Sequence, residues 1–419
     1  MNDLNQNNIS KTENINNIIS YVIIFIGLLI IANTSIFSNN YFILFYSILL
    51  ILFCYIKKKL TIKIEFLAIT FIWLSINIIV SLKFSVDNFE LLRITNVFLK
   101  IILLPYLLLL FFKNSFFEKT EKMILVLTLI SLPLFLLNIL FYDTFSSLLY
   151  IFKPITNPVF FIDKFSDHFT TLFYVNAIKE GSYYRNCGFM WEPGAFALMI
   201  IIMISIKWLR EGVKFDFRFL IYTIALLTTL STAGYVAFSL LFALGLIIKK
   251  SFKYIPIVII FSYFAIPYLN KLDFVGEEIR GYVESYEEDY IGKRHKVYLA
   301  PKVNRFMIVK YDWEKIKTYP WGMGVYRGDE LIGVRNIVGV NGLSNTLVVW
   351  GVPVFMLFLF YLFRFFIIYN RLKINVFFIF FIFICNVIMI FSNPLTYSPI
   401  LYLLIFTPLF INKNEFATS

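Results

Sequence analysis

Residues 219–248 read FLIYTIALLTTLSTAGYVAFSLLFALGLII, an apolar stretch of about 30 residues without a charged side chain. One helix crosses the hydrocarbon core with roughly 20 residues, so this stretch is too long for one span and short for two. Basic residues flank it on both sides: Lys207, Arg210, Lys214 and Arg218 before it, and Lys249, Lys250 and Lys253 after it. Because short loops rich in lysine and arginine stay in the cytoplasm, we predict a helical hairpin that turns outside at residues 231–234.

The rest of the chain has the same apolar character. Hydrophobic residues make up 59% of it and charged residues 15%, and the mean hydropathy is +0.78. A water-soluble core cannot hide so much apolar surface, so we predict an all-α integral membrane protein, a single polytopic domain over residues 1–419. Besides the hairpin, spans are expected near residues 18–37, 41–56, 66–82, 94–112, 123–142, 193–206, 254–270, 345–363, 374–391 and 398–411. Together these make about 12 transmembrane helices.

The basic residues also predict the orientation. At least 17 lysines and arginines lie in the segments assigned to the cytoplasm, whereas the short outer loops carry only Lys83 and Arg93. This asymmetry places both termini in the cytoplasm, and it explains the net charge of +12 without a nucleic-acid partner. Two long loops, about residues 143–192 and 271–343, then lie on the outer side. We expect short helices within them.

The cytoplasmic loops offer little surface for a soluble ligand. They contain no phosphate-binding glycine loop, no aspartate cluster of the kind that holds a nucleotide sugar, and no His-x-x-x-His pair. Cys54, Cys187 and Cys385 are too far apart in sequence to indicate a metal site or a disulfide framework. We therefore expect a substrate that arrives through the membrane, and we predict neither a metal ion nor a cofactor.

The segment YYRNCGFMWEPGAF, residues 183–196, lies where the first long loop returns to the membrane. Pro193 suits the first turn of a helix, and Glu192 would then lie at the positive end of the helix dipole. Glu192 is therefore either a helix-start residue or a reactive carboxylate. Arg185 can bind an anion through two parallel hydrogen bonds. Gly188 would let the backbone approach a ligand closely.

The second long loop passes from an acidic stretch, residues 284–289, to a basic one with Arg294 and His295. The acidic stretch is expected to form a solvated amphipathic helix. Arg305 stands beside apolar residues, as expected near a membrane interface, whereas an isolated histidine is usually a surface residue. Asn345 would either cap the next helix or hydrogen-bond a substrate.

Lys100 is unusual because it lies inside an apolar run. Its simplest interpretation is a side chain that extends along the helix to the outer interface.

The pattern Arg-x-x-Gly-x-x-x-Glu-Pro-Gly at residues 185–194 resembles the segment before a mid-chain helix in bacterial O-antigen polymerases, within the O-antigen ligase and polymerase superfamily. Residues 230–234, LSTAG, are similar to the short hairpin turn of that family. Further residues follow in an order similar to that of its large periplasmic loop and exit helix: Arg305, Trp313, Pro320, Gly322, Gly324, Asn345 and Gly351. The resemblance covers residues 180–360 by motif and the whole chain by topology.

The resemblance implies a glycosyltransferase of the bacterial inner membrane that acts in lipopolysaccharide biosynthesis. It would join repeat units carried on undecaprenyl diphosphate at the periplasmic face, without a metal ion, because arginines stabilise the leaving diphosphate. The donor and the acceptor are then both lipid-linked oligosaccharides. Membrane lipids and a chain-length regulator protein are further implied partners.

The resemblance also suggests roles for individual residues. Arg185 and Arg305 would bind the diphosphate, with Arg280 and Arg294 as further candidates. Glu192 or His295 would accept a proton from the acceptor hydroxyl as general base. Gly188 and Asn345 would contact the substrate elsewhere. The family pattern is Arg-x-Gly and Arg-x-x-x-Leu, whereas this chain has Arg-x-x-Gly and Arg-x-x-x-Val, so the match between the loops is approximate.

Three alternatives remain. One is a purely structural scaffold, which would gain nothing from arginines beside the bilayer. An O-antigen ligase, which transfers the finished polymer to the lipid A core, would favour a histidine near the start of the helix after the second loop, and residues 342–345 contain none. A flippase or transporter of lipid-linked oligosaccharides would also have about 12 helices, but it would not need two long loops on one face. The sequence favours a polymerase.

Overall fold

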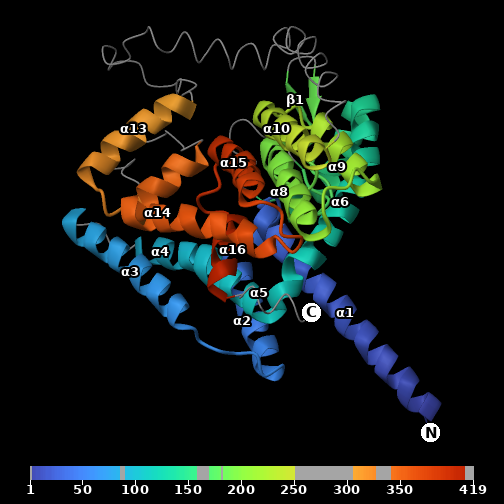
Figure 1. The fold of residues 1–419 in the computed structure, drawn as a ribbon, viewed down its shortest axis with the longest axis horizontal. Helices are drawn as coiled ribbons and strands as arrows, with labels where there is room; N and C mark the ends of the chain where they lie inside the picture. Colours follow the sequence, from blue (N-terminus) through green and yellow to red (C-terminus); the bar gives the residue numbers. More distant parts are fainter. Residues whose placement is uncertain are drawn as a thin grey trace.

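The computed structural model describes residues 2–84, 90–157, 169–180, 183–250, 305–326 and 341–410. These residues are mostly helical (Figure 1). The helices of the first part are α1 (Asn2–Ala32), α2 (Asn40–Ile56), α3 (Ile64–Phe84), α4 (Glu90–Phe98), α5 (Leu104–Phe112), α6 (Phe116–Leu140) and α7 (Tyr142–Leu149). Those of the second part are α8 (Pro193–Glu211), α9 (Phe217–Thr228), α10 (Thr232–Ile248), α13 (Arg305–Thr318), α14 (Gly342–Tyr369), α15 (Val376–Ser392) and α16 (Pro399–Phe410).

Helices occur at every predicted span that falls within the described residues. Two helices, α9 and α10, form at the predicted hairpin, although the turn between them, residues 229–231, comes slightly before the predicted one. That this hairpin crosses the membrane and turns outside stays a prediction. The predicted first span is wrong at its end, because α1 stops at Ala32 instead of residue 37. The predicted span 254–270 and the acidic stretch 284–289 lie outside the described residues.

Four helical segments of the described part are long and apolar enough to cross a membrane: Ile64–Lys83, Leu91–Leu140, Pro193–Glu211 and Gly342–Tyr369. Six shorter apolar helices accompany them: Asn16–Ala32, Asn40–Ile56, Phe217–Thr228, Thr232–Ile248, Val376–Ser392 and Pro399–Leu409. This architecture is that of an all-α membrane protein. The total of about 12 spans stays a prediction.

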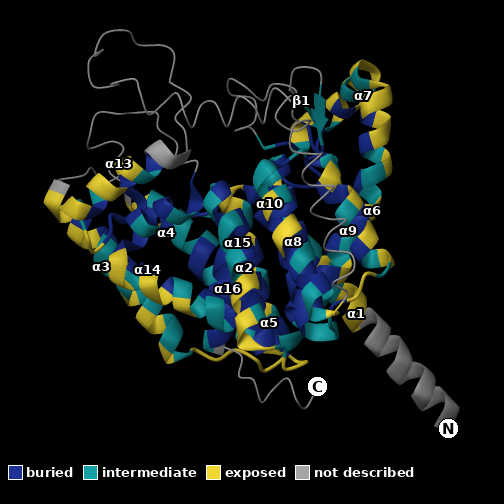
Figure 2. Ribbon diagram, turned by 45° about the horizontal axis from the view of Figure 1, so that its top comes forward, coloured by how far each residue is buried: buried dark blue, intermediate teal, exposed yellow. Residues whose placement is uncertain are grey.

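Helix α8 forms the centre of the bundle. All its side chains from residue 195 to 209 are buried, and it packs against α9, α10, α14 and α15. By contrast, large apolar side chains are exposed on α3, α6 and α14, where Figure 2 shows yellow residues along the outside of the bundle. A surface of exposed leucine, isoleucine and phenylalanine is what a lipid-facing helix requires.

Loops that the sequence assigns to the outer side gather at one end of the bundle, which we call the outer end. Ser35, between α1 and α2, pairs with Thr156 of the first long loop. The backbone N–H of Asn186 donates at 2.9 Å to the carbonyl of Thr228, the last residue of α9. Thr396, between α15 and α16, donates to the carbonyl of Gly342 at 3.3 Å.

Segments assigned to the cytoplasm gather at the opposite end, which we call the inner end. Here the buried carboxylate of Glu121 in α6 lies 3.7 Å from Arg210 in α8 and 3.5 Å from Arg218 in α9. Lys207, also buried, donates to Asp216. The two sets of loops therefore lie at opposite ends of the bundle. The orientation in the membrane stays a prediction.

The first long loop is not built from short helices alone, as the sequence suggested. Besides α7 and the helical turn η4 (Tyr150–Ile155), it contains an antiparallel pair of strands, β1 (Ile178–Glu180) and β2 (Tyr183–Arg185). A small apolar cluster lies beside this hairpin and is formed by Phe135, Leu149, Phe169, Tyr174 and Ala177. The hairpin positions Arg185 at its last residue.

Candidate functional site at the outer end

Arg185 lies at the turn of the α9–α10 hairpin. Its Nε donates to the backbone oxygen of Thr229 at 3.3 Å, just beyond the last residue of α9. The carbonyl end of a helix carries partial negative charge, so the guanidinium is stabilised there. The next residue, Asn186, is fully buried, and its Nδ2 donates to Thr228 Oγ1 at 2.9 Å. These bonds fix the position of the half-buried Arg185 at the outer end.

Gly188 has a structural reason to be glycine. Its φ is +56°, and a Cβ at this position would lie 2.6 Å from the ring of Phe196. Its carbonyl accepts from the N–H of Val175 at 2.7 Å, and its N–H donates to Asn186 Oδ1 at 2.8 Å. The space that this glycine leaves is therefore occupied by Phe196. The expected contact of Gly188 with a ligand stays a prediction.

Glu192 stands immediately before α8, which begins at Pro193 as the sequence predicts. The backbone of Glu192 is extended, with φ −153° and ψ 157°, and its carboxylate makes no capping hydrogen bond to the helix. Glu192 therefore occupies the N-cap position of α8, but its carboxylate does not serve as the cap. The side chain is half-buried at the outer end, and its reactive role stays a prediction.

Asn345 does not cap α14, so that alternative is wrong. The cap is Asn341, whose Oδ1 accepts from the N–H groups of Leu343 and Ser344, both at 3.0 Å. Asn345 lies one turn further along the helix and is buried, with 5% of its surface exposed. Its contact with a substrate stays a prediction.

The buried Asp312 in α13 was not identified from the sequence. Ser344 Oγ donates to its Oδ2 at 2.6 Å, and Lys315 lies 3.5 Å from its Oδ1. This contact fastens α13 to the start of α14. An aspartate three residues before a lysine on a charged helix is expected to form a solvent-exposed ion pair. The sequence therefore does not indicate that Asp312 is buried.

Asn393 connects the two segments that carry four of the eight sequence-predicted site residues. Gly194, at the start of α8, and Gly342, at the start of α14, both lie against it. A Cβ on Gly194 would lie 2.5 Å from Asn393 Oδ1, and one on Gly342 would overlap the Asn393 backbone oxygen. Residues 185–194 and 341–345 therefore meet at the turn between α15 and α16. Sequence reasoning missed Asn393, which is 1% exposed.

The other predicted residues are described only in part. Arg305 is the first residue of α13, a helix that packs along α14 with Ile308 buried, but its side chain lies outside the described part. Arg280, Arg294 and His295 lie outside the described residues altogether. Their expected roles therefore stay predictions.

Helix α14 is broken within its apolar stretch, at Gly351 (φ +75°). The segment after α13 satisfies the backbone groups that the break releases. The N–H of Met323 donates to the carbonyl of Val348, and the N–H of Val352 donates to the carbonyl of Pro320, both at 2.8 Å. Irregular backbone at membrane depth is tolerated where protein buries it, and here residues 320–323 do so.

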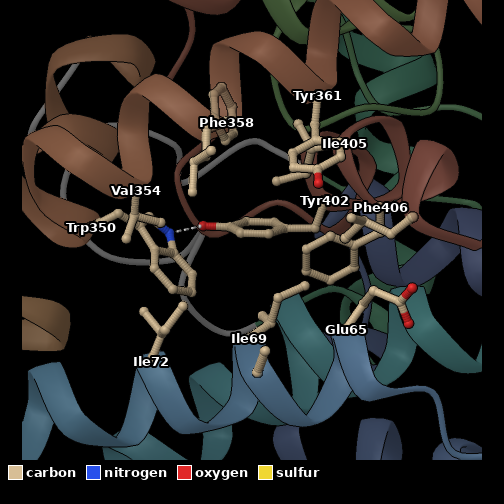
Figure 3. A pocket seen from close by; sticks show the side chains of 13 residues that line it. Glu65, Ile69, Ile72, Trp350, Val354, Phe358, Tyr361, Tyr402, Ile405 and Phe406 are labelled. Atoms are coloured by element: carbon tan, nitrogen blue, oxygen red, sulfur yellow. Dashed lines mark hydrogen bonds between the residues drawn. The ribbon is translucent and has the colours of Figure 1, made fainter.

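An apolar groove of about 230 Å³ lies between α3, α14 and α16. Trp350 Nε1 donates to Tyr402 Oη at 2.9 Å on its wall, and Glu65 lies at one end, as Figure 3 shows. The remaining lining is almost entirely aliphatic or aromatic, so the groove suits a hydrocarbon chain better than a sugar or a phosphate. The candidate site for polar chemistry is therefore the outer end.

Within the described residues, no group of three or more His, Cys, Asp and Glu side chains is arranged to hold a metal ion. The chain matches no known family, no curated protein and no solved structure.

Proposed function

We propose that the chain is a surface polysaccharide polymerase of the O-antigen type, in the inner membrane, with its site facing the periplasm. It transfers a glycan from undecaprenyl diphosphate onto a second lipid-linked repeat unit. The observation that carries the proposal is the convergence of residues 185–194 and 341–345 on Asn393. These segments end the two long loops, so a substrate held between them contacts both.

The proposed reaction needs one proton acceptor and one stabiliser of negative charge. The acceptor hydroxyl loses its proton to a general base while its oxygen attacks the anomeric carbon of the donor sugar. The bond between that carbon and the diphosphate oxygen breaks, and the diphosphate leaves with the electron pair. Arg185 and Arg305 stabilise the charge on the leaving group.

Glu192 is the better supported of the two base candidates. Its carboxylate is not used to cap α8, and it belongs to the same short segment as Arg185. His295 lies outside the described residues, so no contact supports its role.

Gene deletion followed by gel electrophoresis of lipopolysaccharide tests the proposal against its alternatives. Core with one repeat unit supports a polymerase. Bare core with accumulated lipid-linked polymer would instead indicate a ligase. Bare core without polymer on the outer face would indicate a flippase.

A further inference from the structure

Lys100 lies in a π-helical turn, η2 (Leu99–Leu103), between α4 and α5. Such turns inside apolar helices frequently occur at functional sites. The turn packs against α2 and α16, and the neighbouring Ile101 and Ile102 are fully buried. A lysine in such a segment is costly to bury and is a candidate for function.

The Lys100 side chain extends towards the outer end, as predicted. Its Nζ donates to Asn33 Oδ1 at 3.1 Å, in the turn between α1 and α2. Asn33 has a φ of +55°, and its carbonyl accepts from Asn157 Nδ2 at 3.3 Å. The first long outer loop therefore holds the acceptor of Lys100 in place.

The charge of Lys100 is not balanced within the described residues. No salt bridge to it is found there, and Asn33 supplies an amide oxygen without charge. An ammonium group has three N–H donors, so one neutral acceptor leaves capacity for an anion.

The buried cations at the inner end show the contrast. Lys207 is 1% exposed and is paired with Asp216. The side chain of Arg210 is 8% exposed and is paired with Glu211. A half-buried cation without a counter-ion is unfavourable. Lys100 therefore needs an anion from outside the described residues, whereas Lys207 and Arg210 already have carboxylate partners.

Hydrogen bonds connect the surroundings of Lys100 to the candidate site. Thr156, adjacent to Asn157, accepts from the N–H of Thr170 at 3.2 Å through its Oγ1. Thr170 pairs with Val175, and Val175 donates to the carbonyl of Gly188. A continuous series of hydrogen bonds and backbone pairings therefore links the turn at Asn33 to the segment that contains Arg185.

We propose that Lys100 binds a phosphate or diphosphate group at the outer end, beside Asn33. The anion has two chemical sources, the headgroup of an anionic phospholipid and the diphosphate of a prenyl-linked substrate. The prenyl-linked diphosphate as the source rests on the proposed function. Binding of a phosphate group by Lys100 does not rest on it. Lysine binds such oxygens as a point charge, which suits a group that is further positioned by arginine.

Binding to the purified full-length protein in detergent tests this inference, with undecaprenyl diphosphate and phosphatidylglycerol as separate probes. Lys100→Met should weaken binding of one probe by about tenfold or more, the value of one charge-assisted contact. Loss for undecaprenyl diphosphate alone identifies the substrate diphosphate, and loss for phosphatidylglycerol alone identifies a headgroup. Lys153→Met removes an exposed lysine of the first long loop and should leave both affinities unchanged.

Asn33→Asp provides a second test that keeps the lysine. The new carboxylate would pair with Lys100 and compete with an external anion, so this variant should also weaken binding. If Lys100→Met fails to fold, this variant decides alone. Wild-type affinities for both probes in the folded variants would overturn the inference and leave Lys100 as an interface anchor. Because the readout is binding, this result is separate from the lipopolysaccharide phenotype that tests the polymerase.

Discussion

Gly322 and Gly351 lie backbone against backbone at the point where α14 breaks. A Cβ on Gly322 would lie 2.7 Å from the backbone nitrogen of Gly351, and one on Gly351 would overlap the carbonyl carbon of Trp321. Both residues have positive φ, +98° and +75°. Neither side of the contact has room for a side chain, so the segment after α13 can sit beside the broken helix only if both positions are glycine.

We therefore expect Gly322→Ala and Gly351→Ala each to destabilise the protein, because each adds a clash with backbone to a strained φ. The strain alone costs about 1–3 kcal/mol. Thermal unfolding in detergent measures the effect. Gly27→Ala is the matched control, since a Cβ at this position of α1 would meet Leu108 of α5 at 3.6 Å, an ordinary contact. Equal melting temperatures for all three variants would contradict the described packing.

Arg185→Ala should abolish long O-chains while protein abundance stays normal, because the side chain is only half-buried and the adjacent, buried Asn186 keeps this segment bonded to Thr228. Arg185→Lys should also fail if two parallel hydrogen bonds to the diphosphate are needed. Lipopolysaccharide gels and immunoblots measure both properties. Lys179→Ala is the control, because Lys179 pairs with Tyr184 and so lies on the opposite face of the same hairpin. A wild-type ladder from Arg185→Ala would remove this residue from the site.

Glu192→Gln separates the reactive role of the carboxylate from its place at the helix start. Since the carboxylate does not cap α8, the variant should still fold with an intact start of that helix, which thermal unfolding in detergent checks. Polymer formation should be lost, because glutamine cannot accept the proton from the acceptor hydroxyl. A stable variant that still makes long chains would exclude Glu192 as the base and leave His295 as the candidate.

The ion pair at the inner end should make stability depend on pH. Burial of Asp216 opposes its ionisation. The hydrogen bonds from Lys207 and from the N–H of Phe219, together with the charges of Lys207 and Arg218, outweigh this and hold the pKa of Asp216 below its ordinary value. A carboxyl with a lowered folded pKa stabilises the protein above its unfolded pKa, and this contribution is lost as pH falls through the folded pKa. Melting temperatures of the wild type should therefore decrease in acid below about pH 4.

Asp216→Asn should remove that part of the acid dependence and destabilise the protein by about 3 kcal/mol at neutral pH, because it leaves Lys207 buried without a partner. The double variant with Lys207→Met should recover much of this loss. If the double variant is as unstable as Asp216→Asn, the unpaired lysine is not the cause.

Local sequence signals predicted several elements correctly. The charges that flank residues 219–248 required a hairpin, and α9 and α10 form it. Pro193 marked the start of α8, and that helix begins there. These signals act through neighbours in the chain, so no knowledge of distant contacts was needed.

The residues that assemble the candidate site were harder to predict. Asn393 gains its role from Gly194 and Gly342, which are far from it in sequence, and Asp312 gains its role from Ser344. Asparagine is a common N-cap, so residue type alone allows either Asn341 or Asn345 to cap α14. The observed start of the helix at Gly342 makes Asn341 the cap. Such roles depend on which helix ends meet, and a single sequence does not encode that in any local pattern.

The most direct measurement of the central claim uses the purified full-length protein in lipid, supplied only with an undecaprenyl-diphosphate-linked repeat unit. We predict that wild-type protein converts this unit into a ladder of lipid-linked glycans and releases undecaprenyl diphosphate, while Arg185→Ala does neither. A folded wild-type protein that binds the lipid-linked unit but leaves its glycan length unchanged would contradict the account.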